Sequence, residues 1–524
     1  MTSVDNIHRN TIGAALNRSA RKHAQKRALT FGERTWSYQA LNNAANQVAN
    51  ALLEAGLAPG DRLAVYGKNS DAYVIAWLAC SKAGLIHVPV NFALSSDELR
   101  YILEQSGAKG VLSDAVLGDK VRAAVAGLSL VVNGTLQAEG ASLQEDAFDV
   151  LACTHGVHAS LAHAAHEPSV ALEGASVAQL LYTSGTTAAP KAAIMSHQAL
   201  IAEYMACMVA LDIQADDAVL AALPLYHSAQ MHVFLMPALL LGAPVILLEA
   251  PLPESCLAAI SQHQISSFFA PPTVWISLLR HPHFDQYDLS SLRKAYYGAS
   301  IMPVPVLEEM QQRFHGVGLY NCYGQSEIAP LATVLRPEEH AERPASAGRP
   351  ILTVETRIVD LEGNDVPPGE HGEIVHRSPQ LMLGYWDKPE MTAEAFQGGW
   401  FHSGDVGYVD EAGYLYIVDR IKDVINTGGV LVASREVEEV LFKHTAVSEV
   451  AVVGLPDDKW IEAITAVVVL KEGQSASEAE LIRHAKGLIA PYKVPKRVMF
   501  TDALPKSTAG KILKRHLRQA LGES

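Results

Sequence analysis

Apolar positions at helical spacing alternate with short apolar runs along the first 150 residues of the chain. From Tyr38 to Leu53 the apolar residues lie three and four positions apart, which predicts a helix that ends at Gly56. Arg62 to Tyr66 reads RLAVY and predicts a buried strand, and the helical pattern returns from Ala72 to Ala83. This alternation predicts an α/β domain with mainly parallel strands. No G-x-G-x-x-G opens any of these helices, so a nicotinamide or flavin site has no support.

Four later segments share one pattern, an apolar run that ends in a turn carrying Gly, Ser, His or Glu. They are Val219 to His227, Ser267 to Pro272, Lys294 to Ala299 and Gly318 to Glu327. In an open α/β sheet, loops that leave the carboxyl ends of the strands converge on one crevice. These four tips therefore predict a common pocket.

A hydroxyl-rich loop, TSGTTAAPK from Thr183 to Lys191, lies between an apolar run (Val177 to Tyr182) and a helical pattern that starts at Ala199. The order strand, loop, helix is suited to presenting N–H groups, hydroxyls and one cation to a phosphate. It is not a Walker A loop, because Pro190 replaces the second glycine and Ala192 replaces the Ser or Thr that would hold magnesium. Taken alone, the loop could equally be an ordinary polar turn after a core strand.

Beyond about residue 350 the pattern changes to short strands with Gly and Asp turns, which predicts a small β subdomain. The charged run from Asp419 to Asp423 separates two apolar strands and is a candidate interdomain hinge. After it, Val437 to Phe442 and Glu478 to Leu488 predict helices, while Val450 to Gly454 and Ala463 to Leu470 predict strands. These elements form a compact α+β unit with a basic tail.

Length and charge narrow the class of protein. The chain has 524 residues, too many for one core, and a formal net charge of −15. The acidic balance argues against nucleic-acid binding, so an anionic ligand must be held by local donors. The five cysteines are scattered and include no C-x-x-C pair, which favours a reduced, cytoplasmic setting.

The N-terminal sequence MTSVDNIHRN has no apolar h-region, so no secretory signal is predicted. The most hydrophobic stretch, Val233 to Leu248, is interrupted by Pro237, Gly242 and Pro244. A membrane-spanning helix needs about 20 apolar residues. We therefore predict a buried helix followed by a core strand, and a soluble protein with no transmembrane segment.

Histidines cluster near Cys153, at His155, His158, His163 and His166. A metal site is conceivable there. The stretch is rich in Ala and Ser and lacks zinc-type spacing, so a solvated loop is the favoured interpretation.

The chain contains, in order, the motifs YTSGTTAAPK, PLYH, YYGA, NCYGQSE, WFHSGD, DRIKD and PKSTAGK. This series resembles the acyl- and aryl-CoA synthetase, adenylation-domain and luciferase superfamily over essentially the whole chain. The phrases PLYHSAQMHVF and APPTVWISLLRHP further resemble bacterial fatty-acyl-CoA ligases. The resemblance implies two half-reactions: a carboxylate attacks the α-phosphate of ATP and releases pyrophosphate, and a thiol then attacks the acyl-adenylate and releases AMP.

The same resemblance implies which residues act. The β- and γ-phosphates would be held by Thr183, Ser184, Gly185, Thr186, Thr187 and Lys191. Magnesium would be held by Glu327 and Thr183. The rest of the ATP site would comprise Gly298, Ala299, Asn321, Tyr323, Gly324, Gln325, Ser326, Asp405, Arg420 and Lys511. The acid pocket would comprise His227, Ser228, Met231, Ala270, Pro272, Gly298 and Tyr323. The catalytic residues would be Lys511, Glu327, His227 and Thr183.

The resemblance also implies a moving C-terminal domain. Lys422 falls at the hinge position, dividing an N-terminal AMP-binding domain (residues 1–421) from a mobile C-terminal domain (residues 422–524). The small domain would withdraw Lys511 after adenylation and bring Gly428 and Gly429 to the pantetheine tunnel of CoA. The expected fold is thus α/β: a large N-terminal domain of layered α/β subdomains plus a small β subdomain, with a small mobile α+β C-terminal domain.

Two departures from the family pattern bear on these roles. Ala188 and Ala192 stand where the family commonly has glycines, so their backbone must adopt ordinary conformations or the loop must be stiffer than usual. The apolar pair Val430-Leu431 follows Gly429 in place of a Glu-Asn pair, which leaves the acceptor in question. Ser434 is expected to cap the next helix.

The expected activity is ATP- and Mg²⁺-dependent ligation of a medium- or long-chain fatty acid to CoA. Three alternatives stay open: an aryl or ring-bearing acid, transfer to a carrier protein or an amine, and a nucleotide-binding protein without catalysis. The expected partners are a small carboxylic acid, ATP and CoA, with a homodimer as a further option.

Overall fold

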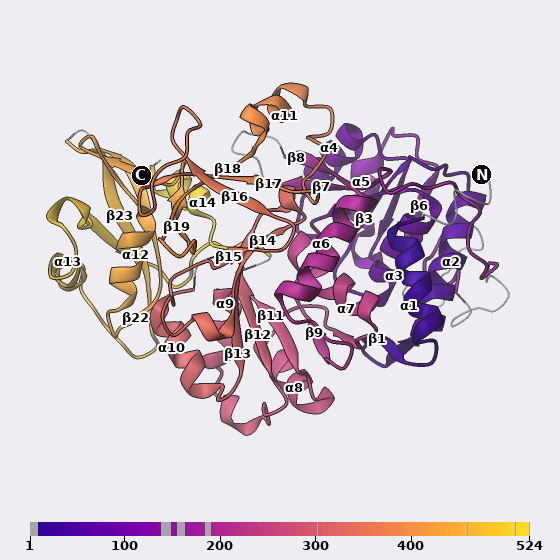
Figure 1. Cartoon of the computed structure of the whole chain (residues 1–524), viewed down its shortest axis with the longest axis horizontal. Coiled ribbons are helices and arrows are strands. Elements are labelled where there is room, and N and C mark those ends of the chain that lie inside the picture. Colours follow the sequence, from indigo (N-terminus) through magenta and orange to yellow (C-terminus); the bar gives the residue numbers. More distant parts are fainter. Residues whose placement is uncertain are drawn as a thin grey trace.

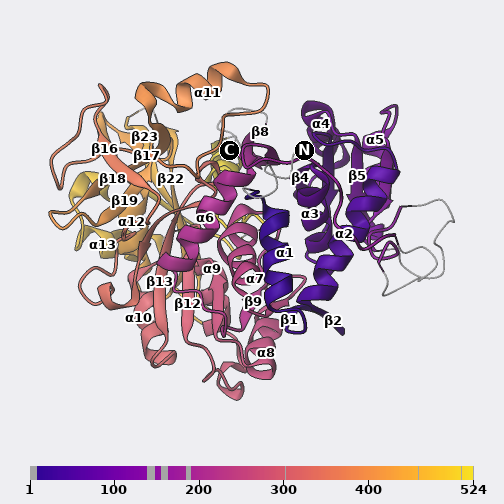
Figure 2. The same cartoon turned by 45° about the vertical axis from the view of Figure 1, so that its right-hand side comes forward.

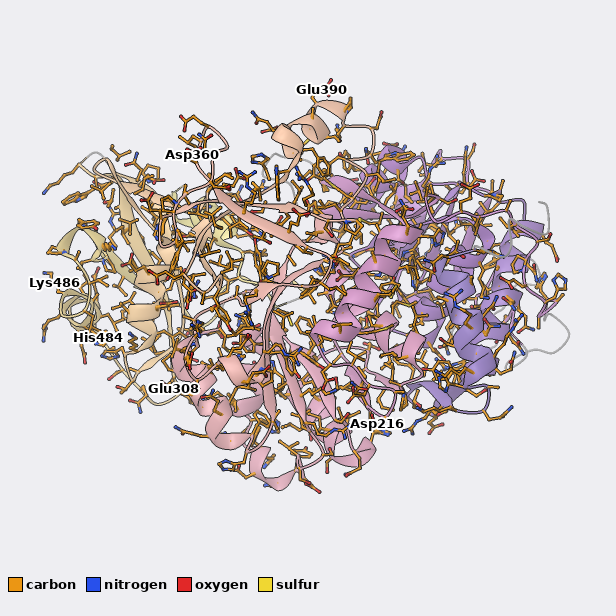
Figure 3. All side chains as sticks on the ribbon, viewed as in Figure 1. Asp216, Glu308, Asp360, Glu390, His484 and Lys486 are labelled. Carbon is orange, nitrogen blue, oxygen red and sulfur yellow. The ribbon has the colours of Figure 1, made fainter. Side chains whose placement is uncertain are left out.

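The computed structural model describes residues 9–137, 148–154, 163–183, 190–300, 302–457, 459–508 and 510–522. The described part of the chain contains four β-sheets. Two large sheets and their helices form the N-terminal part, and two smaller sheets follow toward the C-terminus (Figure 1). Charged side chains such as Asp216, Asp360 and Glu390 lie at the periphery (Figure 3). The predicted α/β class, with its small C-terminal α+β domain, is confirmed.

The first sheet has six strands, all parallel to their neighbours except the antiparallel pair β7–β8. In spatial order they are β6 (Val132–Thr135), β5 (Gly110–Ser113), β3 (Arg62–Tyr66), β4 (Ile86–Val90), β7 (Val177–Thr183) and β8 (Lys191–Ser196).

The second sheet has nine strands, of which the six central ones are parallel. In spatial order they are β15 (Arg349–Pro350), β14 (Leu331–Leu335), β13 (Gly318–Gly324), β12 (Lys294–Gly298), β11 (Ser267–Ala270), β9 (Val219–Ala221), β10 (Val245–Leu247), β1 (Arg27–Phe31) and β2 (Arg34–Ser37). The four strands with predicted functional tips, β9, β11, β12 and β13, are consecutive neighbours. Their carboxyl ends therefore lie side by side, as predicted.

Helices cover both large sheets. They are α1 (Ile12–Lys22), α2 (Tyr38–Glu54), α3 (Asp71–Ala83), α4 (Ser96–Ser106), α5 (Gly118–Val125), α6 (His197–Ala210), α7 (Met236–Leu241), α8 (Pro253–His263), α9 (Pro272–Leu279) and α10 (Val304–Arg313). All of α3 is buried, and α1, α6 and α7 lie together beside it between the strands of the two sheets (Figure 2). A helix buried on every side carries apolar residues on all its faces, as α3 does from Ala72 to Cys80; its buried polar residues, Asp71, Ser81 and Lys82, lie at its two ends.

The stretch from Val233 to Leu248 forms the end of a π-helix (η2, Ala229–Leu235), then α7 and β10. The predicted buried helix followed by a core strand is therefore confirmed. No helix among the described residues is long and apolar enough to cross a membrane.

The third sheet is antiparallel and forms the predicted β subdomain. Its strands are β16 (Glu355–Val359), β17 (Gly372–Arg377), β18 (Phe401–Val409) and β19 (Leu415–Arg420), and α11 (Pro389–Ala395) lies between β17 and β18 in the chain.

The C-terminal unit has its own sheet and core. Its elements are β20 (Ile425–Thr427), β21 (Val430–Val432), β22 (Val447–Asp457), β23 (Ile461–Leu470), β24 (Arg497–Phe500), α12 (Ser434–Phe442), α13 (Glu478–Lys486) and α14 (Lys514–Gly522). The expected Ser434 cap is wrong: Ser434 is the first residue of α12, and its N–H and hydroxyl both donate to Asp419 Oδ2, at 2.6 and 2.7 Å. The Asp419 carboxylate therefore binds the serine hydroxyl that was expected to cap the helix N-terminus.

Candidate active site

The hydroxyl-rich loop closes a β-hairpin. Thr183 at the end of β7 pairs with Lys191 at the start of β8. The expected strand–loop–helix order is wrong, because β8 intervenes before α6 begins at His197. Lys191 is thus aimed by strand register and not by a helix N-terminus.

Part of this loop lies outside the described residues, namely Ser184, Gly185, Thr186, Thr187, Ala188 and Ala189. Ala192 lies inside β8, opposite Tyr182 and fully buried, so it has ordinary extended backbone as expected.

Glu327 lies beside the base of this hairpin, in the short turn η4 (Ser326–Ile328) after β13. Its Oε1 accepts hydrogen bonds from Thr183 Oγ1 at 3.3 Å and from the Tyr385 hydroxyl at 3.1 Å. Its backbone carbonyl accepts from Met382 N at 2.8 Å, and the residue is buried. The structure therefore brings the two predicted magnesium residues together at one buried position.

Lys191 contacts the ring face of Tyr385, whose hydroxyl donates to Glu327. The Lys191 Nζ lies 3.8 Å from the centroid of the tyrosine ring. Burial lowers the pKa of Lys191, and the charge of Glu327 partly opposes that shift. A carboxylate, a hydroxyl and an ammonium group thus share one small site. Oxygen donors with a single carboxylate are what Mg²⁺ prefers when phosphates complete its coordination, so these residues fit the ion.

Asp405 on β18 is the centre of a second cluster. Its Oδ2 accepts from the Tyr323 hydroxyl at 2.8 Å and from Gln325 Nε2 at 2.7 Å, and Arg420 Nε lies 3.1 Å from Oδ1. Asp405 is buried, whereas Arg420 on the neighbouring strand is partly exposed. The predicted ribose carboxylate is therefore held in a fixed orientation by three donors.

The glycines at the ends of β12 and β13 have a steric reason. A Cβ on Gly298 would lie 2.2 Å from Cys322 O, and one on Gly324 would lie 1.7 Å from Pro330 O. Ala299 follows in the left-handed region, with φ of 63°. Asn321 donates to Ser346 O at 2.8 Å, so its amide group holds β13 to the segment just before β15.

The predicted acid-pocket residues surround the carboxyl ends of these strands. Ser228 Oγ lies 2.9 Å from Ser326 Oγ, which joins the PLYH segment to the Glu327 turn. Met231 and Ala270 are buried, and Pro272 begins α9. In the buried core, Phe234, on the same π-helix as Met231, stacks on Phe269 with ring centroids 4.3 Å apart and lies 5.1 Å from the ring of Tyr296.

Lys511 enters this site from the C-terminal domain. Thr273 Oγ1 donates to Gly510 O at 2.9 Å, and the hydroxyls of Thr508 and Tyr226 are hydrogen-bonded. The side chains of Lys511 and His227 are solvent-accessible, yet surrounding protein desolvates both. Desolvation, reinforced by Arg420, lowers the pKa of Lys511 to about 8. Desolvation, reinforced by Lys511, lowers the pKa of His227 to about 4, so that this imidazole is neutral at pH 7.

The predicted hinge residue lies within electrostatic reach of Lys511 and Arg420, and the predicted tunnel glycines follow it in the chain. Lys422 is in the segment between β19 and β20, where burial and then Arg420 lower its pKa. Gly428 and Gly429 form the turn between β20 and β21, with φ of 65° and 87°. The division at residues 421 and 422 stays a prediction.

Several residues of the site were missed by the sequence analysis. Tyr385 contacts both Glu327 and Lys191, and Tyr226 and Thr273 dock the Lys511 loop. Tyr226 precedes His227, so its place in the PLYH motif was a usable signal. Tyr385 lies 58 residues after Glu327 in a loop, and no spacing rule connects the two.

The histidine cluster forms no metal site where it can be followed. His155 and His158 lie outside the described residues. His163 Nδ1 lies 3.0 Å from Glu54, and His166 lies against the carbonyl of Glu167. Within the described ranges, no three His, Cys, Asp or Glu side chains gather to hold a metal ion.

Comparison with known proteins agrees with this geometry. The AMP-binding enzyme family profile matches residues 16–386, and the AMP-binding enzyme C-terminal domain profile matches residues 436–511. The chain is 37% identical over 512 residues to a feruloyl-CoA synthase of Amycolatopsis sp, covering 98% of this chain and 99% of that protein. It is 33% identical to the long-chain-fatty-acid–CoA ligase of Bacillus subtilis (strain 168), covering 97% and 94%.

A crystal structure of the anthranilate CoA ligase AuaEII in complex with anthranoyl-AMP has a TM-score of 0.89 to this chain. The two are 27% identical, and the match covers 97% of each chain. The chain therefore belongs to the AMP-binding enzyme family, as an adenylate-forming acyl-CoA ligase.

Proposed function

We propose that this ligase activates an aryl or other ring-bearing carboxylic acid and transfers it to CoA. In the first step a carboxylate oxygen bonds to the α-phosphorus of ATP and pyrophosphate leaves. In the second step the thiol sulfur bonds to the acyl carbon, AMP leaves, and the thiol proton passes to solvent. The expected medium- or long-chain fatty acid becomes the second candidate.

The observation that carries the ring-bearing substrate is the similarity to a feruloyl-CoA synthase, which is 37% identical to this chain over 98% of its length. The anthranilate CoA ligase in complex with anthranoyl-AMP, another enzyme named for a ring-bearing acid, supports the same choice with a TM-score of 0.89. The rings of Phe234, Phe269 and Tyr296 pack on one another in the buried core, so they support the pocket residues Met231 and Ala270 from inside the protein. The similarity to the Bacillus subtilis enzyme keeps the fatty acid as a candidate.

The nucleotide end of the reaction would use the Thr183–Glu327–Lys191 site. Glu327 and Thr183 would hold Mg²⁺, which when bound neutralises phosphate charge. Lys191 would contact the outer phosphates. Lys511, beside neutral His227, would stabilise the charge that gathers on the α-phosphate oxygens during attack. Asp405 would accept hydrogen bonds from the ribose hydroxyls, since its orientation is already fixed by Tyr323 and Gln325.

A basic aromatic surface on the C-terminal domain supports CoA as the acceptor. Trp460 lies between two cations, with Lys459 Nζ 5.1 Å and Lys496 Nζ 4.6 Å from its ring. Gly428 N donates to Trp460 O at 2.6 Å, which places this surface beside the predicted tunnel glycines. An aromatic face with flanking lysines suits the adenine ring and phosphates of CoA.

The test is CoA-dependent AMP release with ferulate, cinnamate, benzoate, a steroid acid, octanoate and palmitate at equal concentration. We expect kcat/KM for a ring-bearing acid to exceed that for palmitate by at least about tenfold, the size of effect that one or two poorly filled pocket groups produce. A preference for palmitate would overturn the ring-bearing substrate. Acyl-adenylate formation without CoA consumption would instead point to a carrier-protein or amine acceptor.

A further inference from the structure

One buried carboxylate has no part in the site described above. Glu203 on α6 is fully buried, and both of its oxygens accept hydrogen bonds. Oε1 accepts from Leu331 N at 2.9 Å and from Cys207 Sγ at 3.3 Å, and Oε2 accepts from Gln380 Nε2 at 2.6 Å. Burying a carboxylate without a cation is costly, and here burial raises its pKa to about 8. An apolar side chain of similar size would fill this position at lower cost, so a polar role is indicated.

The partners of Glu203 flank the turn that carries Glu327. Besides contacting Glu203, Gln380 Nε2 donates to Ile328 O at 2.9 Å and to Leu331 O at 2.6 Å. Ile328 directly follows Glu327, and Leu331 begins β14. Glu203 therefore holds the Leu331 end of the turn directly, by accepting from Leu331 N. It also holds both ends, Ile328 and Leu331, indirectly, because it orients the Gln380 amide that donates to both of their carbonyls.

The segment that contains Gln380 reaches Glu327 itself. The carboxylate of Glu327 accepts from the Tyr385 hydroxyl at 3.1 Å, five residues beyond Gln380. Gln380 is in turn fixed by Thr353, whose hydroxyl donates to Gln380 Oε1 at 2.5 Å. The amide of Gln380 therefore cannot reverse its two ends without losing its carbonyl partners.

We propose that Glu203 is a positioning residue for Glu327, acting through Leu331 and Gln380 to fix the turn and the carboxylate that it presents. The inference rests on the proposed function, in which Glu327 holds the magnesium of ATP. It also gives α6 a role in the site, because this helix follows β8, the strand that begins with Lys191. One helix thus connects the cation and the carboxylate of the nucleotide site.

The most selective variant is Glu203→Gln, which preserves size and replaces one acceptor oxygen by an NH₂ group. That group must face a donor, either Leu331 N–H or the Gln380 amide, and neither can turn away. Loss of a residue that supports a metal ligand typically lowers metal affinity or activity about 10- to 100-fold. We expect an increase of that size in the Mg²⁺ concentration for half-maximal ATP–pyrophosphate exchange, with the KM for the acid unchanged.

Tyr204→Phe is the matched control. Tyr204 is adjacent in sequence, equally buried, and loses one hydrogen bond, to His232 Nδ1 at 2.8 Å, without touching the turn. We expect its Mg²⁺ requirement to equal that of the parent protein. An equal increase in both variants would overturn the inference, because general loosening of α6 would then explain it.

A double-mutant cycle with Glu327→Gln distinguishes positioning from general destabilisation. If Glu203 acts through Glu327, Glu203→Gln adds little to the defect of Glu327→Gln, whereas additive losses would overturn the inference. An unchanged Mg²⁺ requirement in Glu327→Gln alone would overturn the magnesium role itself, a result distinguishable from failure at Glu203. Thermal unfolding checks each variant, and Gln380→Asn replaces Glu203→Gln in the same cycle if the latter does not fold.

Discussion

The Glu327 turn and the Lys511 loop deliver opposite charges to one site, and the structure holds them in contrasting ways. Glu327 is buried, and its turn is held by a hydrogen bond from Gln380 Nε2 to Ile328 O and by one from Leu331 N to Glu203. Lys511 is solvent-accessible, and its loop is docked through the hydroxyls of Tyr226 and Thr273. The Glu327 carboxylate is buried within the N-terminal part of the chain. The Lys511 loop is held by contacts between the C-terminal unit and the N-terminal part, which have separate hydrophobic cores.

This contrast fits a ligase that performs two steps in one site. Stabilising charge on the α-phosphate is needed only during adenylation, so a cation that can be withdrawn suits the first step. In the proposed function the carboxylate would hold Mg²⁺ whenever ATP occupies the site, so a fixed position suits it. Withdrawal of Lys511 by rotation near Lys422 stays a prediction, and the experiments below test the contrast in order of expected effect.

Removing the cation should have the largest effect. We expect Lys511→Ala to lower ATP–pyrophosphate exchange on the order of 10²- to 10³-fold, the usual loss when one charge-stabilising donor is removed. Thioester formation from supplied acyl-adenylate should be preserved, because the predicted withdrawal of Lys511 would remove the donor from that step. Arg515→Ala is the control, since it removes an exposed charge from the same basic tail. Equal loss of both half-reactions in Lys511→Ala would remove the distinction between the two regions.

Weakening the docking of the loop should have the next largest effect. Gly510 has φ of +80°, and a Cβ there would lie 2.6 Å from Thr273 Oγ1. Left-handed backbone in a non-glycine residue costs about 1–3 kcal/mol, so Gly510→Ala should slow adenylation roughly 5- to 160-fold and leave thioester formation intact. Thr273→Val, which loses only the 2.9 Å hydrogen bond, is the milder companion. If Gly510→Ala slowed only thioester formation, the docked loop would not be the adenylating arrangement.

The pH dependence should follow Lys511. With the pKa lowered to about 8, the protonated and active form predominates below that pH and is lost above it. We expect kcat/KM for ATP to fall as pH rises through about 8, approaching about tenfold per pH unit, because this ratio reports the free enzyme. In Lys511→Arg the alkaline fall should disappear, since arginine stays protonated. Persistence of the fall in that variant would assign it to another group.

The smallest effect is expected at Asp405, which has three donors. Tyr323→Phe removes the 2.8 Å hydrogen bond but leaves Gln325 and Arg420 in place. One neutral hydrogen bond contributes about 0.5–1.5 kcal/mol, so the KM for ATP should rise only about 2- to 12-fold. A loss as large as that of Lys511→Ala would mean that Tyr323 does more than orient the carboxylate.

Local sequence patterns predicted the strands and their order well, because buried strands and their turns have short-range signatures. Val219, Ser267, Lys294 and Gly318 each begin a strand at the residue where the apolar run begins. The hairpin between Thr183 and Lys191 was mistaken for a strand–loop–helix unit, since six residues of β8 have too little pattern to exclude a loop. The preferred fatty-acid substrate gained less support than the ring-bearing alternative.

Contacts between distant segments could not be predicted. Glu203 and Gln380 are 177 residues apart, and their hydrogen bond exists only because α6 packs beneath the loop after β17. Glu203 also looks like an ordinary helix-surface residue in sequence, since glutamate is a strong helix former. A buried polar network is a property of packing, so its members carry no local signature.

Tyr385 has a consequence for how the nucleotide site is prepared before ATP arrives. A free ammonium and a free carboxylate placed this close would tend to neutralise each other. The tyrosine instead offers its ring face to Lys191 at 3.8 Å and its hydroxyl to Glu327 at 3.1 Å. Because both groups contact the tyrosine, the ammonium and the carboxylate feel each other's charge without forming a direct ion pair. The ammonium thus stays available to an anion and the carboxylate to a cation, so neither has to break an ion pair before Mg²⁺ and phosphate bind.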